Sequence, residues 1–232
     1  MTVPEHRQPV IQLSEKKPFS SGGNRICYRH PDFPNRCLKV FRERGRPENR
    51  RSRKRFPANL RPLETFDENL IEQKTLQFLH HNFPEAIRRH LPTSYGIVET
   101  DLGSAHDTTL ICDHDGRIAQ TLEQYLWDND LDDRVKDCLK RFKADWSQCP
   151  PSTRDLIPHN LVVQASENGH LDLFLIDGYG RTPKFYQPKK PRFKASLLRR
   201  RMENLDRRIE KVLEKNPNSD GLNLPQTQLI RD

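Results

Sequence analysis

Alternation of apolar and polar residues predicts a β-rich beginning for the chain, after a disordered stretch at residues 1–9. Ile11 and Leu13 stand two positions apart, as side chains on one face of a first strand do. Residues 19–28 follow as a strand, a glycine turn and a second strand, and residues 36–41 form a further β-prone run. These patterns predict a small antiparallel sheet near the N-terminal end.

Helical spacing of apolar residues appears from the middle of the chain onward. A helix is predicted over residues 67–81, with Asp67 as its N-cap. Its buried stripe is expected to consist of Leu70, Ile71, Phe78 and Leu79. Further helices are predicted to begin after an N-cap at Thr121, to span 131–146, and to span 193–213 as a long amphipathic element.

Two hairpins are predicted between the helices. The first pairs residues 91–100 with 107–112 across a turn at 101–106, which is rich in turn-forming residues. The second pairs residues 161–164 with 171–176. Together with the helices, these strands predict an α+β fold.

The composition indicates long exposed segments around the core. The chain has 232 residues, of which 33% are apolar and 31% are charged, and its formal net charge is +8. A chain of this length can bury a sizeable core, and its positive charge favours anionic partners. Two runs, 42–55 and 184–201, hold eight cations each. Neither run has regularly spaced aromatic residues for base stacking, so we expect solvated faces rather than a nucleic-acid site.

Cysteine usage and hydropathy predict a reduced, cytoplasmic protein. The cysteines form no Cys-x-x-Cys pair and no zinc-ligand spacing with histidine. They are Cys27, Cys37, Cys112, Cys138 and Cys149. Neither a signal-peptide core nor an apolar run of about 18 residues occurs. The apolar stripe of the helix at 193–213 lacks tryptophan, so we expect no membrane partner.

Three polar side chains late in the chain have the spacing of a phosphoryl-transfer site. Asp155 precedes Asn160 by five residues, and Asp177 follows directly on the apolar run 173–176. Such transfer needs a carboxylate beside the attacking hydroxyl, with an amide oxygen and a second carboxylate on Mg²⁺. Asp155 is therefore the candidate catalytic residue, and Asn160 and Asp177 are the candidate metal ligands.

Candidate phosphate ligands precede these residues in the chain. Gly22 and Gly23 let the backbone approach a phosphate closely, because they carry no Cβ and tolerate positive φ. Lys39 stands among apolar neighbours in its strand and is the candidate cation for the phosphates. Glu72 in the following helix is the preferred carboxylate to hold that lysine, and Glu68, one turn earlier, stays open as its competitor.

The backbone of Ile111, Cys112 and Asp113, at the end of the first hairpin, is the candidate for reading the adenine of a nucleotide. Each of the site residues, taken alone, also suits an ordinary turn, cap or surface position. Their joint order along the chain is what favours a site for ATP and Mg²⁺.

Several strings of the sequence resemble one family. They are residues 27–31, 36–40, 96–103, 115–116 and 158–161. These strings resemble the YrbL family of PhoP regulatory network proteins, which are themselves kinase-like. The resemblance implies a compact, two-lobed, protein-kinase-like fold with a small β-rich N-lobe and a reduced, mainly helical C-lobe. It also implies a role in bacterial PhoP-linked regulation.

The departures from an active protein kinase bear on the expected activity. Residues 153–155 read Thr-Arg-Asp in place of His-Arg-Asp, and the lysine expected two residues later is Ile157. Residues 177–180 read Asp-Gly-Tyr-Gly, which lacks the phenylalanine of Asp-Phe-Gly, and no Ala-Pro-Glu string follows. Arg181 or the substrate itself could supply the missing cation.

We therefore expect a kinase-like protein with an N-lobe over 10–113, a basic insertion at 42–66, a C-lobe over 114–215 and a flexible tail over 216–232. Its partners would be a nucleotide and an unidentified protein or small molecule, whose hydroxyl accepts a phosphoryl group. The alternative is a catalytically silent kinase-like regulator that binds a protein partner.

Overall fold

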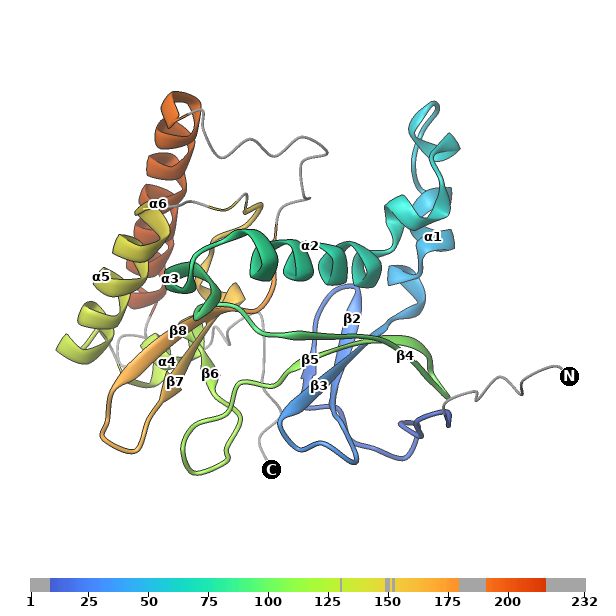
Figure 1. Ribbon diagram of the computed structural model, residues 1–232, viewed down its shortest axis with the longest axis horizontal. Helices are drawn as coiled ribbons and strands as arrows, with labels where there is room; N and C mark the ends of the chain where they lie inside the picture. Colours follow the sequence, from blue (N-terminus) through green and yellow to red (C-terminus); the bar gives the residue numbers. More distant parts are fainter. Residues whose placement is uncertain (1–8, 130, 149–150, 152, 180–190, 216–232) are drawn as a thin grey trace, which may run out of the picture. The chain divides into compact units, whose positions relative to one another are not determined.

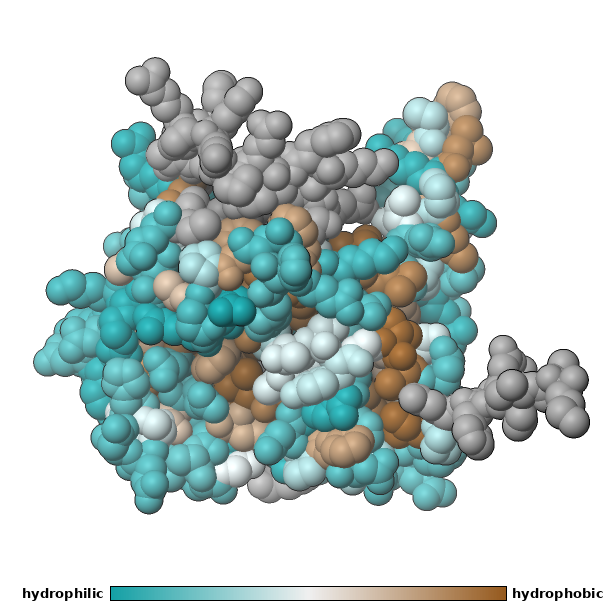
Figure 2. Space-filling model, in the orientation of Figure 1, coloured by the Kyte–Doolittle hydropathy of each residue, from teal (hydrophilic) through white to brown (hydrophobic). Residues whose placement is uncertain are grey.

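The computed structural model describes residues 9–129, 131–148, 151, 153–179 and 191–215 (Figure 1). The expected tail at 216–232, Arg181, Cys149 and nearly all of the predicted disordered N-terminus lie outside these residues. Among the described residues, one compact unit comprises 9–73 and 94–109, and a second comprises 74–93 and 110–215. Hydrophilic residues cover most of the face shown in Figure 2, as the 31% of charged residues leads one to expect.

The first unit is built on a five-stranded antiparallel sheet in the order β1-β2-β3-β5-β4. Its strands are β1 (Ser20–Ser21), β2 (Arg25–Arg29), β3 (Arg36–Phe41), β4 (Ser94–Thr100) and β5 (Gly103–Thr109). The predicted strand–turn–strand at 19–28 and the predicted strand at 36–41 are confirmed. The register places Lys39 of β3 between Cys27 of β2 and His106 of β5.

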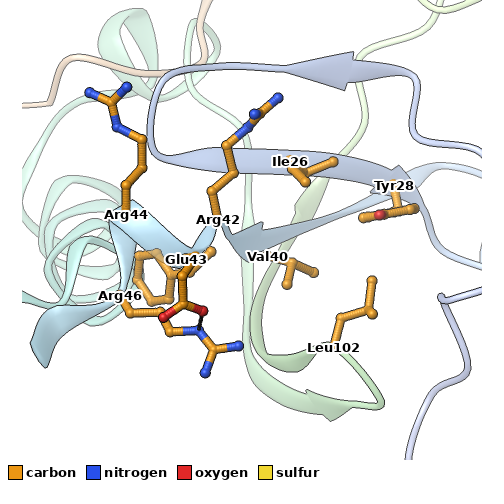
Figure 3. Close-up of a pocket in the computed structure, with 9 residues that line it drawn as sticks. Ile26, Tyr28, Val40, Arg42, Glu43, Arg44, Arg46 and Leu102 are labelled. Atoms are coloured by element: carbon orange, nitrogen blue, oxygen red, sulfur yellow. Dashed lines mark ion pairs between the residues drawn. The ribbon is translucent and has the colours of Figure 1, made fainter. Parts of the chain in front are cut away.

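The two faces of this sheet differ in chemistry, because successive side chains on a strand point to opposite sides. One face is apolar and is covered in part by Leu13; Ile26, Tyr28 and Val40 lie on it (Figure 3). The other face carries the buried polar residues Arg25, Lys39 and His106. The first turns of helix α2 (Glu68–Asn82) lie against this polar face, since Glu72 contacts Lys39 there.

Two predictions for the first unit are wrong in detail. Ile11 forms only an isolated bridge with Thr100, so residues 11–13 are not a strand. The turn predicted at 101–106 is only Asp101 and Leu102, because β5 already begins at Gly103. Gly103 has a φ of +104°, a conformation that glycine adopts at little cost and that permits so short a loop.

The stretch at 42–66, expected to be a basic insertion, contains several short helices. They are η1 (Glu43–Gly45), α1 (Pro47–Ser52), η2 (Ala58–Leu60) and η3 (Leu63–Phe66), of which three are 3₁₀ turns. Pro47 stands in the first turn of α1, where its missing N–H costs nothing. The insertion is therefore not one irregular loop.

Helix α2 begins as predicted, since Asp67 Oδ1 accepts a hydrogen bond from the N–H of Leu70 at 2.9 Å. Its buried stripe differs from the prediction. The buried residues are Asn69, Glu72, Thr75, Leu76 and Leu79, whereas Leu70, Ile71 and Phe78 are half-buried. Glu72 therefore lies within the buried stripe.

The second unit combines helices with a small sheet. Its helices include α3 (Glu85–Arg88), α4 (Leu122–Asn129), α5 (Asp133–Gln148) and α6 (Pro191–Leu213). Its sheet has the antiparallel order β6-β7-β8, with β6 (Gln120–Thr121), β7 (Leu161–Ala165) and β8 (Leu171–Leu175). Thr121 caps α4 as predicted, through the N–H of Gln124 at 3.2 Å. The observed helices and antiparallel sheets confirm the α+β class.

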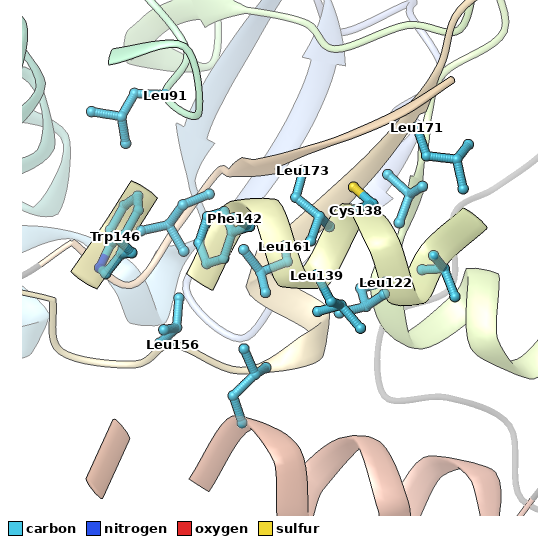
Figure 4. Close-up of a cluster of buried hydrophobic side chains, with 14 of the residues drawn as sticks. Leu91, Leu122, Cys138, Leu139, Phe142, Trp146, Leu156, Leu161, Leu171 and Leu173 are labelled. Carbon is cyan, nitrogen blue, oxygen red and sulfur yellow. The ribbon is translucent and has the colours of Figure 1, made fainter. Parts of the chain in front are cut away.

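The core of the second unit gathers around α5. Phe142 and Trp146 of α5 stack with ring centroids 4.8 Å apart, and Leu173 of β8 belongs to the same cluster (Figure 4). The hairpin of β7 and β8 also has a second apolar face, where Val162 clusters with Ile111 and with partly buried residues that include Phe174. No helix in the described ranges is both long and apolar enough to span a membrane.

Candidate functional site

The sheet and α2 together form a buried ion pair in the first unit. Lys39 Nζ lies 2.5 Å from Glu72 Oε1, and both side chains are less than a tenth exposed. The backbone of Lys39 is also fixed, because its carbonyl accepts a hydrogen bond from Asn69 Nδ2 at 3.0 Å. Glu72, rather than Glu68, is thus the carboxylate beside Lys39. Glu68 pairs instead with Arg50, at 2.5 Å.

A second cation shares this carboxylate. Arg25 of β2 places its guanidinium 2.5 Å from Glu72 Oε2, and its side chain is 10% exposed. Burial alone would raise the pKa of Glu72, but the charges of Arg25 and Lys39 hold it well below its ordinary value of 4.5. Sequence reasoning missed Arg25, because an arginine at the start of a strand carries no pattern that points to a helix distant in the chain.

His106 completes the polar cluster from β5. Its Nδ1 lies 3.5 Å from Glu72 Oε1, at the outer limit of a hydrogen bond, and its Nε2 lies 2.8 Å from Ser94 Oγ. Complete burial lowers the pKa of His106, against the opposing effect of the Glu72 carboxylate. The ring is therefore neutral near pH 7, and Lys39 and Arg25 carry the positive charge of the cluster.

The glycine turn before β2 is present, but neither glycine needs its conformational freedom. Neither Gly22 nor Gly23 is among the glycines with positive φ. A Cβ at Gly22 would lie 3.8 Å from the carbonyl oxygen of Arg25, and one at Gly23 would have no heavy atom within 4 Å. The space beside Gly23 is thus open. The roles of Gly22 and Gly23 as phosphate ligands stay predictions.

The second unit brings together the three polar residues predicted late in the chain. The carbonyl of Gly178 accepts hydrogen bonds from the N–H groups of Arg154 and Asp155, at 2.8 and 3.2 Å. Asn160 Nδ2 donates to the carbonyl of Asp155 at 2.8 Å, and Asp177 Oδ1 accepts from the N–H of Gly178 at 2.6 Å. Asp155, Asn160 and Asp177 therefore form one hydrogen-bonded cluster at the end of the β7–β8 hairpin.

Gly178 makes this cluster possible. Its φ is +78°, and a Cβ there would lie 2.4 Å from the carbonyl oxygen of Asp155 and 2.7 Å from Asn160 Nδ2. Contacts so short do not occur for real side chains, so only glycine fits. The two loops that carry the polar residues meet at this position.

The donor atoms of this cluster suit Mg²⁺. Since Asn160 donates through Nδ2, its Oδ1 is the atom that remains for a metal, and Asp177 supplies a carboxylate. Mg²⁺ commonly takes one or two protein oxygens and completes its shell with water and phosphate. In the described ranges, no group of three or more His, Cys, Asp and Glu side chains is placed to hold a metal without such help.

Two arginines lie close to Asp155, the candidate for orienting an acceptor hydroxyl. Arg154 Nε is 2.7 Å from Asp155 Oδ2. Arg201 of α6 donates to Thr153 Oγ1 at 3.0 Å; burial lowers its pKa, while the charge of Asp155 acts in the opposite direction. The loop that has Ile157 in place of lysine therefore still has cations beside its aspartate. Arg201 lies too far along the sequence for spacing to have suggested it.

The candidate adenine contacts already take part in hydrogen bonds of the second unit. The carbonyl of Ile111 accepts from Ala119 N–H at 3.1 Å, and that of Cys112 accepts from Gln164 Nε2 at 2.6 Å. The N–H of Asp113 donates to the carbonyl of Arg117 at 2.8 Å. An adenine bound by these groups would have to replace or share those hydrogen bonds. The role of these residues in adenine binding stays a prediction.

Comparison with known proteins identifies the family. The family model described as "PhoP regulatory network protein YrbL" matches residues 11–215. The chain belongs to the YrbL family. One YrbL relative is "Uncharacterized protein YrbL" from Escherichia coli (strain K12), 26% identical over 180 residues that cover 75% of each chain. The protein of the same name from Shigella flexneri matches with the same identity and coverage. The family name links the chain to the PhoP regulatory network.

Proposed function

We propose that this YrbL-family chain is a kinase-like protein that binds ATP with Mg²⁺ and transfers a phosphoryl group to a hydroxyl acceptor in PhoP-linked regulation. The observation that carries the proposal is the buried ion pair of Lys39 with Glu72. In protein kinases a lysine of the third strand and a glutamate of the following helix form such a pair, and the lysine contacts the α- and β-phosphates. The order of elements in the first unit supports a kinase-like N-lobe.

The cluster of the second unit supports the metal half of the proposal. Asn160 and Asp177 would hold Mg²⁺ by oxygen atoms, and Asp155 would orient the acceptor hydroxyl and receive its proton. The bound ion would neutralise charge on the phosphates. Lys39 and the cluster of Asp155, Asn160 and Asp177 are both assigned to the nucleotide, so removal of either should weaken binding.

A thermal-shift titration with ATP, with and without Mg²⁺, tests nucleotide binding. A ligand at a hundred times its Kd stabilises a folded protein by about 2.7 kcal/mol, which gives a clear shift. Asp177→Ala should remove the Mg²⁺-dependent part of this shift. Asp172→Ala is a matched control, because Asp172 lies on the same hairpin and is half-buried. An Asp177→Ala variant that keeps the full Mg²⁺-dependent shift would count against the site.

The second candidate function is a catalytically silent regulator on the same scaffold. Ile157 in place of the catalytic-loop lysine favours it, as does the engagement of the Asp155 carboxylate by Arg154. Turnover of ATP separates the two candidates. Asp155→Asn should lower a true phosphotransfer rate by roughly 10²-fold or more and keep Mg²⁺-ATP binding. Nucleotide binding without turnover in the unaltered protein would favour the regulator.

A further inference from the structure

A pocket lies on the apolar face of the five-stranded sheet, opposite the face that carries Lys39. Its volume is about 550 Å³. Its floor is apolar and includes Ile26, Tyr28 and Val40 of the strands and Leu102 of the β4–β5 turn (Figure 3). Tyr28 and Val40 are only 7% and 2% exposed, so they form a recessed floor rather than a protruding surface.

The rim of this pocket is basic. Arg42, Arg44 and Arg46 line it with Glu43, which leaves an excess of two positive charges, three minus one. Glu43 is engaged by Arg46 at 3.1 Å, and Arg42 donates to the neutral hydroxyl of Ser21. The guanidinium of Arg44 makes no ion pair or hydrogen bond within the described part of the chain.

The rim is held firmly over the sheet. A Cβ on Gly45 would lie 2.0 Å from the carbonyl oxygen of Asn24, so the two backbones are in close contact. Asn49 Nδ2 donates to the carbonyl and to the carboxylate of Glu43, at 2.7 and 2.8 Å. The arginines are therefore presented on a fixed backbone, which lowers the conformational entropy that a ligand must remove.

We propose that this pocket docks an acidic segment of a partner protein, with an apolar side chain on the floor and flanking carboxylates on the arginine rim. Guanidinium groups match carboxylates in a two-pronged geometry, and a pocket of this size accepts a large apolar side chain. The site uses neither Lys39 nor Asp177, so it is independent of the proposed nucleotide binding.

Two other classes of ligand fit the pocket less well. Insertion into a membrane surface requires apolar residues that protrude, whereas Val40 and Tyr28 lie at the bottom of a depression. Single-stranded nucleic acid needs exposed aromatic faces for stacking, whereas the ring of Tyr28 is buried and the other aromatic residue of the lining, Phe41, is half-buried. Charge and shape therefore favour an acidic, partly apolar peptide.

Fluorescence anisotropy of a labelled peptide tests the proposal on the full chain. The probe carries one phenylalanine between two pairs of aspartates, and two control peptides replace either the aspartates by asparagine or the phenylalanine by serine. Arg44→Glu should weaken binding about tenfold, since it removes a charge-assisted contact and adds repulsion. Leu102→Ser should weaken binding by removing part of the apolar floor. Arg51→Glu makes the same charge change at an exposed residue outside the pocket and should bind as the unaltered protein does.

The outcomes separate the proposal from its competitors. Loss of binding with Arg44→Glu, with Leu102→Ser and with both control peptides would support it. Equal loss with Arg51→Glu would show attraction to net charge alone and overturn it. Arg44-dependent binding of phosphatidylglycerol–phosphatidylcholine vesicles without peptide binding would overturn it in favour of a lipid surface. Circular dichroism of each variant checks that the fold is retained.

Discussion

At the scale of single residues, the carboxylate of Glu72 determines the chemistry of the first unit. It lies in a buried position and contacts Lys39 and Arg25 at 2.5 Å each, with His106 nearby. A buried charge is tolerated only when it is paired, and removal of one partner leaves the others uncompensated. Lys39 and Arg25 therefore both depend on Glu72 for charge compensation.

Glu72→Gln should lower the free energy of unfolding by about 3 kcal/mol near neutral pH, because it leaves Lys39 and Arg25 buried without a counter-charge. Urea denaturation measures the change. Glu68→Gln is the matched control. Its ion pair with Arg50 is about a fifth exposed, so the loss should be at most about 1 kcal/mol. Equal effects of the two changes would contradict the assignment of Glu72.

The same residue predicts a pH dependence. The pKa of Glu72 is lowered in the folded protein, so its contribution to stability is present above the ordinary value of 4.5 and is lost as pH falls through the lowered pKa. The difference in unfolding free energy between the unaltered protein and Glu72→Gln should therefore shrink with acid. A difference that stays constant below pH 4.5 would refute this origin.

The thiols give another residue-scale prediction. A hydrogen bond from the Cys37 thiol, with help from Lys39 and Arg25, lowers the pKa of Cys27 despite its burial, whereas burial raises the pKa of Cys138 to about 12. The four described cysteines are free. Because thiolate is the reactive form, iodoacetamide at about pH 8 should modify Cys27 before Cys138, as read by peptide mass spectrometry. Equal modification rates of Cys27 and Cys138 in the native protein would contradict this order.

Single residues were predictable where a local pattern marked them. Lys39 stood out as the one lysine among apolar neighbours in its strand, and Glu72 followed from helical spacing. Arg25 and Arg201 had no such mark, because their roles depend on tertiary contacts that spacing does not encode.

At the scale of elements, the meeting of two loops at Gly178 fixes the second cluster. The loop that carries Asp155 and the turn after β8 approach so closely that a methyl group at Gly178 would overlap Asp155 and Asn160. The sequence predicted the hairpin itself, because two short runs of apolar residues flank a turn that contains Asn168 and Gly169. It could not predict this contact between loops, nor the short helices within 42–66, since isolated single turns have little periodicity.

Gly178→Ala should destabilise the protein by more than Gly116→Ala. Both glycines have positive φ, +78° and +81°, so alanine costs about 1–2 kcal/mol at either position. A Cβ at Gly116 meets no atom within 4 Å, whereas one at Gly178 collides with backbone. Thermal denaturation measures both changes. Equal losses would show that the loops do not meet as described.

At the scale of the whole molecule, α2 is shared by the two units. Its first turns carry Glu72, which belongs to the first unit, and its later turns carry Leu76 and Leu79, which belong to the core cluster of the second. Composition and periodicity predicted the α+β class and the order of most elements. They could not specify where one unit ends, because that boundary falls inside a continuous helix.

Lys74→Pro should destabilise both units. Proline inside a helix removes a hydrogen bond and clashes with the preceding turn, at a cost of about 3 kcal/mol. Hydrogen exchange should show lost protection both at Val40 of β3 and at Leu173 of β8. Lys74→Ala, which keeps the helix, is the control. Loss confined to one of these strands would show that the units do not depend on an intact α2.

Arg25 has a consequence for how Lys39 can act. A buried acid with a single partner would keep that partner in place, since any departure would leave an isolated negative charge. With Arg25 already bound to its other oxygen, Glu72 would retain a neutralising neighbour if Lys39 moved toward an anion. Departure of Lys39 would therefore leave the charge of Glu72 neutralised by Arg25.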